Sequence, residues 1–346
     1  MKIGYINGLR GLAILMVIWE HWYSRSFEAH APAFLDPLVS AGNYGVEIFF
    51  VLSGFVLYLP YCNGRPFVAR TYLVHRARRL LPLFYVALFA SAALHRDNPF
   101  PYALLLYPNP QSIGPIFNFP LWSISAEIWF SALLPVLIYL MRWPIAPYLL
   151  IAASLSCALG PEWLQRALPG TLYLFVTGML VAANLRRVRG SILCLPLAIA
   201  AAYLPVQLGR PAAGLAAAGI IFYCWHHSTS PLTRALNNNL LQVFGIMCFS
   251  IYVWHEPVRN ITSGYNAFSP IQLANWTLLG IVAVLSYRFI ERGADRPWER
   301  LLPRPRPPHA PATTPGPSGR PRPADPSLAP FREPGRDVRT ASSRRS

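Results

Sequence analysis

Apolar segments separated by short polar ones follow one another through residues 1–300, and this pattern constrains the fold more than any other feature. Only 13% of the residues are charged, whereas soluble domains carry about 25%. Segments of this length and composition are typical of membrane helices, so we predict an all-α, polytopic transmembrane bundle. We expect about ten spans, at residues 6–23, 42–60, 79–95, 119–140, 145–160, 170–185, 191–206, 211–226, 241–258 and 271–290.

The basic residues between these segments are unequally divided between the two sides of the membrane. Before the C-terminal stretch, one side holds Lys2, Arg65, Arg70, Arg76, Arg78, Arg79, Arg142, Arg186, Arg187, Arg189 and Arg234. The other side holds only Arg25, Arg96, Arg166, Arg210 and Arg259. Cytoplasmic loops carry the excess of Lys and Arg, so both termini are predicted to be cytoplasmic. The expected location is the cell membrane, specifically a bacterial cytoplasmic membrane.

The formal net charge of +16 does not indicate a nucleic-acid partner, because much of it lies near the C-terminus. Residues 303–346 hold nine Arg, three acidic residues and twelve of the 35 prolines. A segment of this composition cannot bury a core and is typical of disorder. We predict a transmembrane domain at residues 1–300 and a disordered, Pro/Arg-rich cytoplasmic tail at residues 301–346.

Arg10 and His21 lie eleven residues apart in the first apolar segment. On a helix this spacing brings both side chains to nearly the same face, about 16 Å apart along the axis. Ionisable side chains inside a membrane are energetically costly and indicate a functional site. For His21 a second interpretation stays open, because its neighbours Trp19, Trp22 and Tyr23 are typical of an interfacial aromatic belt.

Four ionisable residues from four spans are predicted to lie at a similar depth near the outer face: His21, Glu47, Glu127 and His255. Together they suggest an acid/base site, in which a histidine oriented by a carboxylate deprotonates a hydroxyl. Ser123 lies one turn before Glu127, on the same face. Simpler roles remain open: a structural partner for Glu127, an interface position for Glu47, and a structural hydrogen bond for His255.

The cytoplasmic side carries a different signal, five Arg and one His in residues 65–82. One interpretation is a set of contacts with lipid headgroups. The other is a cationic mouth for a polyanionic ligand, since Arg forms charge-assisted and often bidentate hydrogen bonds with phosphates. Arg10, which is predicted to lie in the membrane near this mouth and to need an anionic partner, favours the second.

Six sequence motifs in order carry a resemblance to a known family: NGLRGLAILMVIWEH (7–21), GVEIFFVLSGFVL (45–57), RARRLLPLFY (76–85), LWSISAEIWFSALLP (121–135), FSIYVWHEPV (249–258) and SYRFIER (286–292). With them the chain resembles the acyltransferase-3 family of integral membrane O-acyltransferases over about residues 3–300. Some members carry a fused esterase-like domain, and the chain resembles the stand-alone form without it. Glu256 departs from the family pattern, which puts the role of the ninth span's end in doubt.

The resemblance implies transfer of an acyl group, commonly acetyl, from cytoplasmic acyl-coenzyme A to a hydroxyl of a glycan or glycosylated small molecule. It implies that His21 is the catalytic base or acyl relay, that Arg10 positions the donor or its leaving group, and that Glu127 orients His21 or shares a proton with it. Arg76 and Arg79 match the basic motif and would contact the phosphates of the coenzyme. Substrate or donor contacts are also expected from Glu47, Trp122, Ser123 and His255. We expect acyl-coenzyme A as a substrate, no bound cofactor and no metal.

Two other classes of protein remain possible at this point. A proton-coupled transporter would also need intramembrane Arg, His and Glu, although we find no internal repeat between the two halves. A non-catalytic scaffold would use the basic tail to bind anionic lipid or a partner. The sequence predicts contact with membrane lipid. It identifies neither the acceptor nor the oligomeric state.

Overall fold

The computed structural model describes residues 4–28, 30, 32–62, 66–95, 118–165, 167–262 and 269–292. They belong to the first of two units, Met1–Leu301. Outside the described residues lie the predicted tail and most of the expected loop at 96–118. The same holds for four of the basic residues: Lys2, Arg65, Arg96 and Arg166.

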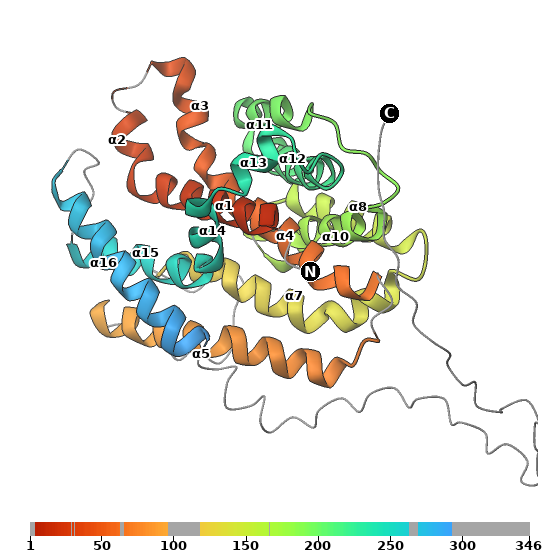
Figure 1. Cartoon of the computed structure of the whole chain (residues 1–346), viewed down its shortest axis with the longest axis horizontal. Coiled ribbons are helices and arrows are strands. Elements are labelled where there is room, and N and C mark those ends of the chain that lie inside the picture. Colours follow the sequence, from red (N-terminus) through yellow and green to blue (C-terminus); the bar gives the residue numbers. More distant parts are fainter. Residues whose placement is uncertain are drawn as a thin grey trace, which may run out of the picture. The chain divides into compact units, whose positions relative to one another are not determined.

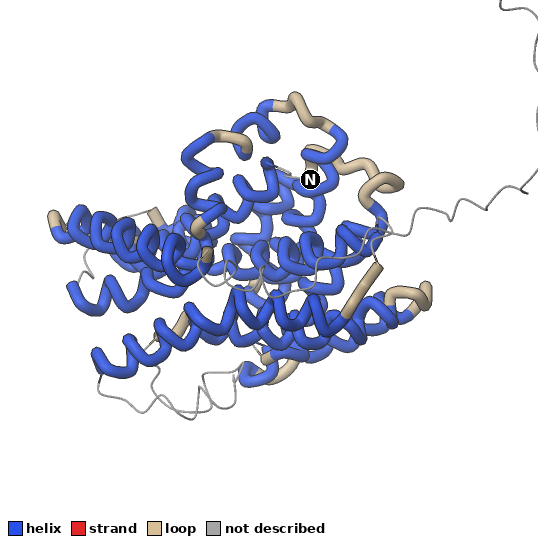
Figure 2. The backbone as a smooth tube through the Cα atoms, turned by 60° about the horizontal axis from the view of Figure 1, so that its bottom comes forward, coloured by secondary structure: helices blue, strands red, loops and turns tan. Residues whose placement is uncertain are grey.

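A helix lies in each of the ten ranges predicted from the sequence, which confirms the all-α fold (Figure 1). The longer helices are α1 (Gly4–Trp22), α4 (Gly45–Cys62), α5 (Ala69–His95), α7 (Leu121–Leu140), α8 (Ala146–Ala158), α10 (Leu168–Asn184), α11 (Cys194–Tyr203), α12 (Val206–His226), α14 (Asn239–Ile246), α15 (Cys248–Thr262) and α16 (Ile271–Leu285). Shorter elements join them: α2 (Ser24–Glu28), η1 (Ala33–Leu35), α3 (Asp36–Val39), η2 (Ser40–Tyr44), α9 (Glu162–Gln165), α13 (Pro231–Leu236) and the π-helical turn η4 (Ser286–Glu291). Figure 2 shows the described chain as closely packed helices with short loops.

Four helical stretches among the described residues are long and apolar enough to cross a membrane: Ala33–Cys62, Ala69–Leu94, Leu121–Leu140 and Ile271–Glu291. Three further apolar helices are shorter: Ala146–Ala158, Leu168–Asn184 and Cys194–Tyr203. Large apolar side chains such as Leu149, Leu193, Leu273 and Phe289 are exposed, as expected for helices in hydrocarbon. The chain is a multi-pass membrane protein. The number of ten spans and the cytoplasmic termini stay predictions.

The predicted ninth span, 241–258, is two helices and not one. Met247 has φ −97° and ψ 10°, which ends α14, and α15 begins at the next residue. The side chain of Asn238 caps the start of α14 by accepting a hydrogen bond from the Leu240 N–H. Helices α1 and α14 are in close contact. Gly11 of α1 lies next to the Leu241 carbonyl of α14, and Gly245 of α14 lies next to the Asn7 carbonyl of α1. A side chain at either glycine would push α1 and α14 apart.

Two clusters of buried apolar side chains hold the helices together. In the first, Phe55 of α4, Phe130 of α7 and Phe175 of α10 are fully buried, and the last two rings stack at 5.0 Å. The second joins α1, α5, α15 and α16 through Ile18, Leu83, Val253 and Ala283. Helices α4 and α10 lie along each other, as do α15 and α16 (Figure 1). The first helix therefore packs with parts of the chain more than 200 residues away.

Candidate active site

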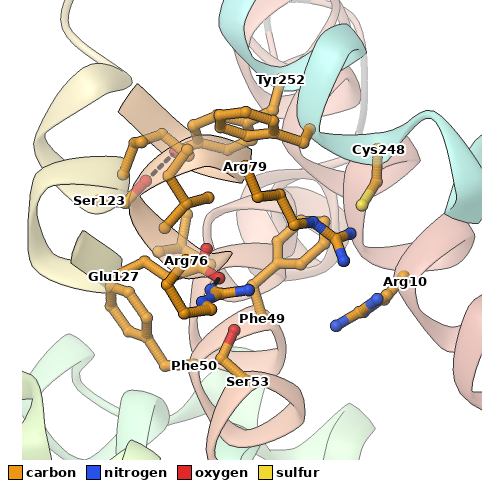
Figure 3. A pocket seen from close by; sticks show the side chains of 14 residues that line it. Arg10, Phe49, Phe50, Ser53, Arg76, Arg79, Ser123, Glu127, Cys248 and Tyr252 are labelled. Carbon is orange, nitrogen blue, oxygen red and sulfur yellow. Dashed lines mark hydrogen bonds and ion pairs between the residues drawn. The ribbon is translucent and has the colours of Figure 1, made fainter. Parts of the chain in front are cut away.

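One pocket is lined by Arg10 of α1 and by Arg76 and Arg79 of α5, and we call it the arginine pocket (Figure 3). It encloses about 620 Å³, including the space at its mouth. Its charged lining residues are Arg10, Arg76, Arg79 and Glu127, so three cations face one anion. The rest of its lining is Val46, Phe49, Phe50, Ser53, Leu80, Ser123, Ile124, Cys248, Phe249 and Tyr252. The pocket is therefore suited to an anion with an apolar extension.

A second pocket of about 470 Å³ contains His21, and we call it the histidine pocket. Its lining is Val17, Glu20, His21, Gly42, Asn43, Val46, Glu47, Phe119, Pro120, Trp122, Arg210 and Tyr252. Val46 and Tyr252 line both pockets, so these two side chains form a wall between them. Helix α1 thus places Arg10 in one pocket and His21 in the other.

Glu127 forms an ion pair with Arg76, with 2.7 Å between Oε1 of Glu127 and Nη2 of Arg76. Nε of Arg76 also donates to the Ser131 hydroxyl at 3.1 Å. Among the described residues no hydrogen bond joins Glu127 to His21, and the two line different pockets. The structure therefore does not bring Glu127 to His21 as expected. The reason is tertiary: α7 packs along α5 and turns this carboxylate toward the nearest cation.

The two other arginines of this pocket, Arg79 and Arg10, differ in whether a carboxylate forms an ion pair with them. Arg79 lies 3.9 Å from the carboxylate of Glu291, which also accepts a hydrogen bond from Ser250. Arg10 is partly buried and forms neither a hydrogen bond nor an ion pair within the described part of the chain. Figure 3 shows its guanidinium group pointing into the pocket. Arg10 therefore has its full hydrogen-bonding capacity available for a ligand.

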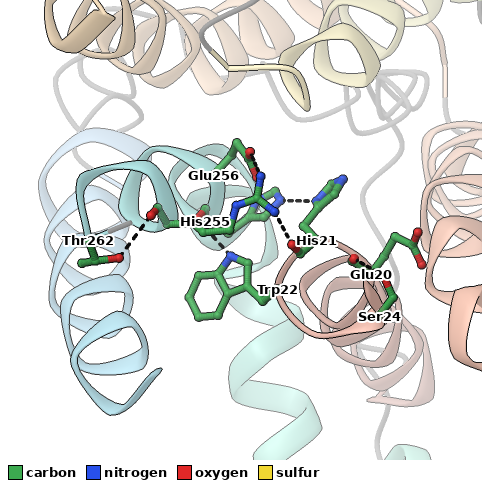
Figure 4. A network of polar contacts seen from close by, with 8 residues as sticks. Glu20, His21, Trp22, Ser24, His255, Glu256 and Thr262 are labelled. Carbon is green, nitrogen blue, oxygen red and sulfur yellow. Dashed lines mark hydrogen bonds and ion pairs between the residues drawn. The ribbon is translucent and has the colours of Figure 1, made fainter. Parts of the chain in front are cut away.

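His21 is bonded to a second histidine from α15, as Figure 4 shows. Nδ1 of His21 lies 2.7 Å from Nε2 of His255, and the rings stack with centroids 4.9 Å apart. His255 is completely buried, and its Nδ1 lies 2.6 Å from the carbonyl oxygen of Tyr252. The lining of neither pocket includes His255. The expected substrate contact is thus a contact with His21 instead.

Three of the remaining predicted site residues lie around the histidine pocket and the wall. Glu47 and Trp122 line the histidine pocket, and Oε1 of Glu47 lies 3.4 Å from Nε of Arg210 in α12. The hydroxyl of Ser123 lies in the arginine pocket, 2.6 Å from the hydroxyl of Tyr252 in a hydrogen bond. This bond fastens Tyr252, and with it the wall between the pockets, to α7.

Several residues of the site were not predicted from the sequence: Glu20, Asn43, Arg210, Tyr252, Arg259 and Glu291. The Asn43 amide donates to the Glu20 carboxylate at 2.9 Å, and Arg259 bonds to the Glu256 carboxylate and the His21 carbonyl. The spacing of Glu256 and Arg259, three residues apart on one helix, was a usable signal for their pair. The other pairings depend on which helices are neighbours.

His21, His255 and Glu256 could also hold a metal ion, because their ligand atoms lie within 4.8 Å of one another. In this structure His255 is bonded through both ring nitrogens, and Glu256 is paired with Arg259. A metal bound to all three would have to replace some of these bonds. The arrangement as found is a hydrogen-bonded network that positions the imidazole of His21.

The relationship of the chain to known proteins follows from one comparison. A family model described as an acyltransferase domain matches residues 3–287, well over half of the chain. Neither a curated protein nor a solved structure matches it. The family match does not favour the transporter alternative. By this match over residues 3–287, the chain belongs to the acyltransferase-3 family, and with its apolar helices it is a membrane acyltransferase.

Proposed function

We propose that this enzyme moves an acyl group, acetyl in the first instance, from coenzyme A to a hydroxyl of a sugar or glycosylated small molecule. The donor would bind in the arginine pocket and the acceptor in the histidine pocket. The observation that supports the proposal is the shared wall, because an arginine-rich pocket and a pocket that contains a potential general base lie on its two sides.

The arginine pocket offers what a coenzyme A thioester needs. Arg10, Arg76 and Arg79 supply guanidinium groups for phosphate oxygens, which they bind through charge-assisted hydrogen bonds. The apolar side chains Phe49, Phe50 and Leu80 would cover the uncharged arm of the coenzyme. The rise of about 16 Å along α1 between Arg10 and His21 is a distance that an extended arm can partly bridge.

The chemistry requires one base near the wall. His21 would take the proton of the acceptor hydroxyl while the hydroxyl oxygen attacks the thioester carbonyl. The tetrahedral intermediate would then break its carbon–sulfur bond, and the thiolate would take the proton from His21. The products are an ester and free coenzyme A, and His21 returns to its starting state. The Tyr252 hydroxyl, at the wall, would donate a hydrogen bond to the carbonyl oxygen as negative charge develops.

The direction of transfer follows from the predicted topology. The arginine pocket would open toward the cytoplasm, where coenzyme A is made, and the histidine pocket toward the outer face. We propose the bacterial cytoplasmic membrane as the location, with contacts to membrane lipid. The polar lining of the histidine pocket, with Glu20, Asn43, Glu47 and Arg210, supports a hydroxyl-rich acceptor.

The test is a turnover assay on the full chain in lipid nanodiscs with acetyl-coenzyme A and a panel of methyl glycosides. Thiol release should require a glycoside and fall at least 100-fold in His21→Ala. His30→Ala is the matched control, because His30 is exposed and bonds to the Ser26 carbonyl outside both pockets. Full turnover by His21→Ala would refute His21 as the base. A protein that moves a proton-coupled solute without consuming acetyl-coenzyme A would support the transporter instead.

A further inference from the structure

The side chain behind His21 is a second imidazole, and its own partners determine where its proton lies. Nδ1 of His255 faces the carbonyl oxygen of Tyr252 at 2.6 Å. A carbonyl oxygen only accepts hydrogen bonds, so Nδ1 of His255 carries a proton and donates it. The protonation of His255 at this nitrogen is therefore set by the backbone of its own helix.

The same side chain is neutral for reasons of burial. His255 is completely enclosed, and an isolated buried cation is strongly disfavoured unless a carboxylate pairs with it. The neighbouring carboxylate, Glu256, is already bound by Arg259. A neutral imidazole with a proton on Nδ1 has its lone pair on Nε2. Nε2 of His255 is therefore a hydrogen-bond acceptor, and it faces Nδ1 of His21 at 2.7 Å.

The state of His21 follows from that bond. Its Nδ1 must donate to His255, so in the neutral imidazole of His21 the lone pair lies on Nε2. Figure 4 shows this second ring nitrogen on the side of the imidazole away from His255.

Two further contacts hold α1 and α15 together here: Trp22 donates to the His255 carbonyl at 3.2 Å, and Arg259 donates to the His21 carbonyl.

We infer that His255 is a positioning residue that holds His21 in the tautomer protonated on Nδ1 and leaves Nε2 as the base toward the acceptor. This inference rests on the proposed function. An imidazole in this place orients His21 without offering it a negative charge. His255 itself gives no carboxylate to hold the proton taken from the acceptor, which passes on from His21 to the leaving thiolate.

The first test needs no substrate. The full chain, labelled with ¹⁵N-histidine in nanodiscs, should show His21 protonated on Nδ1 and unprotonated on Nε2, with its signals assigned through their loss in His21→Ala. Glutamine can place its amide oxygen near the position of a histidine Nε2, so His255→Gln should keep this tautomer. His255→Leu, which offers no acceptor, should lose it. A proton on Nε2 of His21 in the unaltered protein, or no change in His255→Leu, would overturn the inference.

The second test separates this inference from the proposed function. With acetyl-coenzyme A and an active glycoside, His255→Leu should lower kcat about 100-fold and leave the KM for acetyl-coenzyme A within twofold. His255→Gln should recover most of the loss. If the unaltered enzyme turns over and His21→Ala does not, unchanged kcat in His255→Leu refutes only the role of His255. If the unaltered protein does not turn over acetyl-coenzyme A with any glycoside, the proposed function itself is wrong.

Two outcomes would assign His255 a different role. One equivalent of bound zinc in the purified protein, lost in His255→Leu, would make it a metal ligand and overturn the inference. Should His255→Leu fail to fold, the tautomer measured in His255→Gln decides, because a glutamine that keeps the Nδ1 proton on His21 must accept its hydrogen bond.

Discussion

Replacing Glu127 by Gln distinguishes two roles for this carboxylate by the sign of the effect. In the role expected from the sequence, Glu127 orients His21, and the substitution lowers kcat. In the role favoured by the structure, Glu127 engages Arg76 at 2.7 Å and repels an anion in the arginine pocket. We expect the second role, so that Glu127→Gln binds coenzyme A more tightly than the unaltered protein.

The size of the effect follows from the geometry of the pair. The charge centres of an ion pair lie about 4 Å apart, so a phosphate beyond the Arg76 guanidinium would lie about 8 Å from the Glu127 carboxylate. At an effective dielectric constant of about 20, two like charges at that distance repel by about 2 kcal/mol. The side chains are 13% and 23% exposed, and Arg76 loses a partner that holds it in place. We therefore expect a net gain of about 1 kcal/mol, a Kd lower by about fivefold.

The assay is equilibrium binding of coenzyme A to the full chain in nanodiscs, measured together with acetyl-coenzyme A turnover. Glu28→Gln is the control, because Glu28 is exposed and lies in the lining of neither pocket. Weaker binding in Glu127→Gln would refute the electrostatic argument. A large fall in kcat with unchanged binding would restore the role expected from the sequence, in which Glu127 acts on His21.

Two further predictions address the arginine pocket and the packing of α1. Arg10→Gln should weaken coenzyme A binding about tenfold or more, because a hydrogen bond to a charged group contributes about 1.5–3 kcal/mol; binding within twofold of the unaltered protein would show that Arg10 does not touch the donor. Gly245→Ala should lower the thermal unfolding midpoint, because its Cβ would meet the Asn7 carbonyl. Gly280→Ala is its control, since no heavy atom lies within 4 Å of that Cβ; equal midpoints for the two variants would contradict the close packing of α1 on α14.

The class of fold could be predicted because a membrane imposes one strong rule on sequence. Apolar segments long enough to cross it must be helical, so each predicted range contains a helix. The break at Met247 could not be predicted in the same way. It leaves the apolar pattern of residues 241–258 intact, and it becomes visible only in the backbone angles of Met247.

The sequence allowed the site to be predicted within single helices. The predictions that were wrong concern contacts between residues of different helices. The spacing of Arg10 and His21 required only the geometry of a single helix, and the structure places them accordingly in two pockets. The partner of His21 depended on which helix packs beside the end of α1. Glu127 had the expected chemistry but lies on α7 facing Arg76, whereas His255 lies on α15 against His21.

The wall formed by Val46 and Tyr252 has a consequence for the proton permeability of the membrane. Two water-accessible pockets that meet inside a bilayer would together make a leak for protons, and a leak runs continuously while catalysis is intermittent. Between the two pockets lie an apolar side chain, Val46, and a tyrosine that is hydrogen-bonded to Ser123. Substitution of Val46 or Tyr252 by glycine is therefore expected to raise the proton permeability of proteoliposomes that contain the protein.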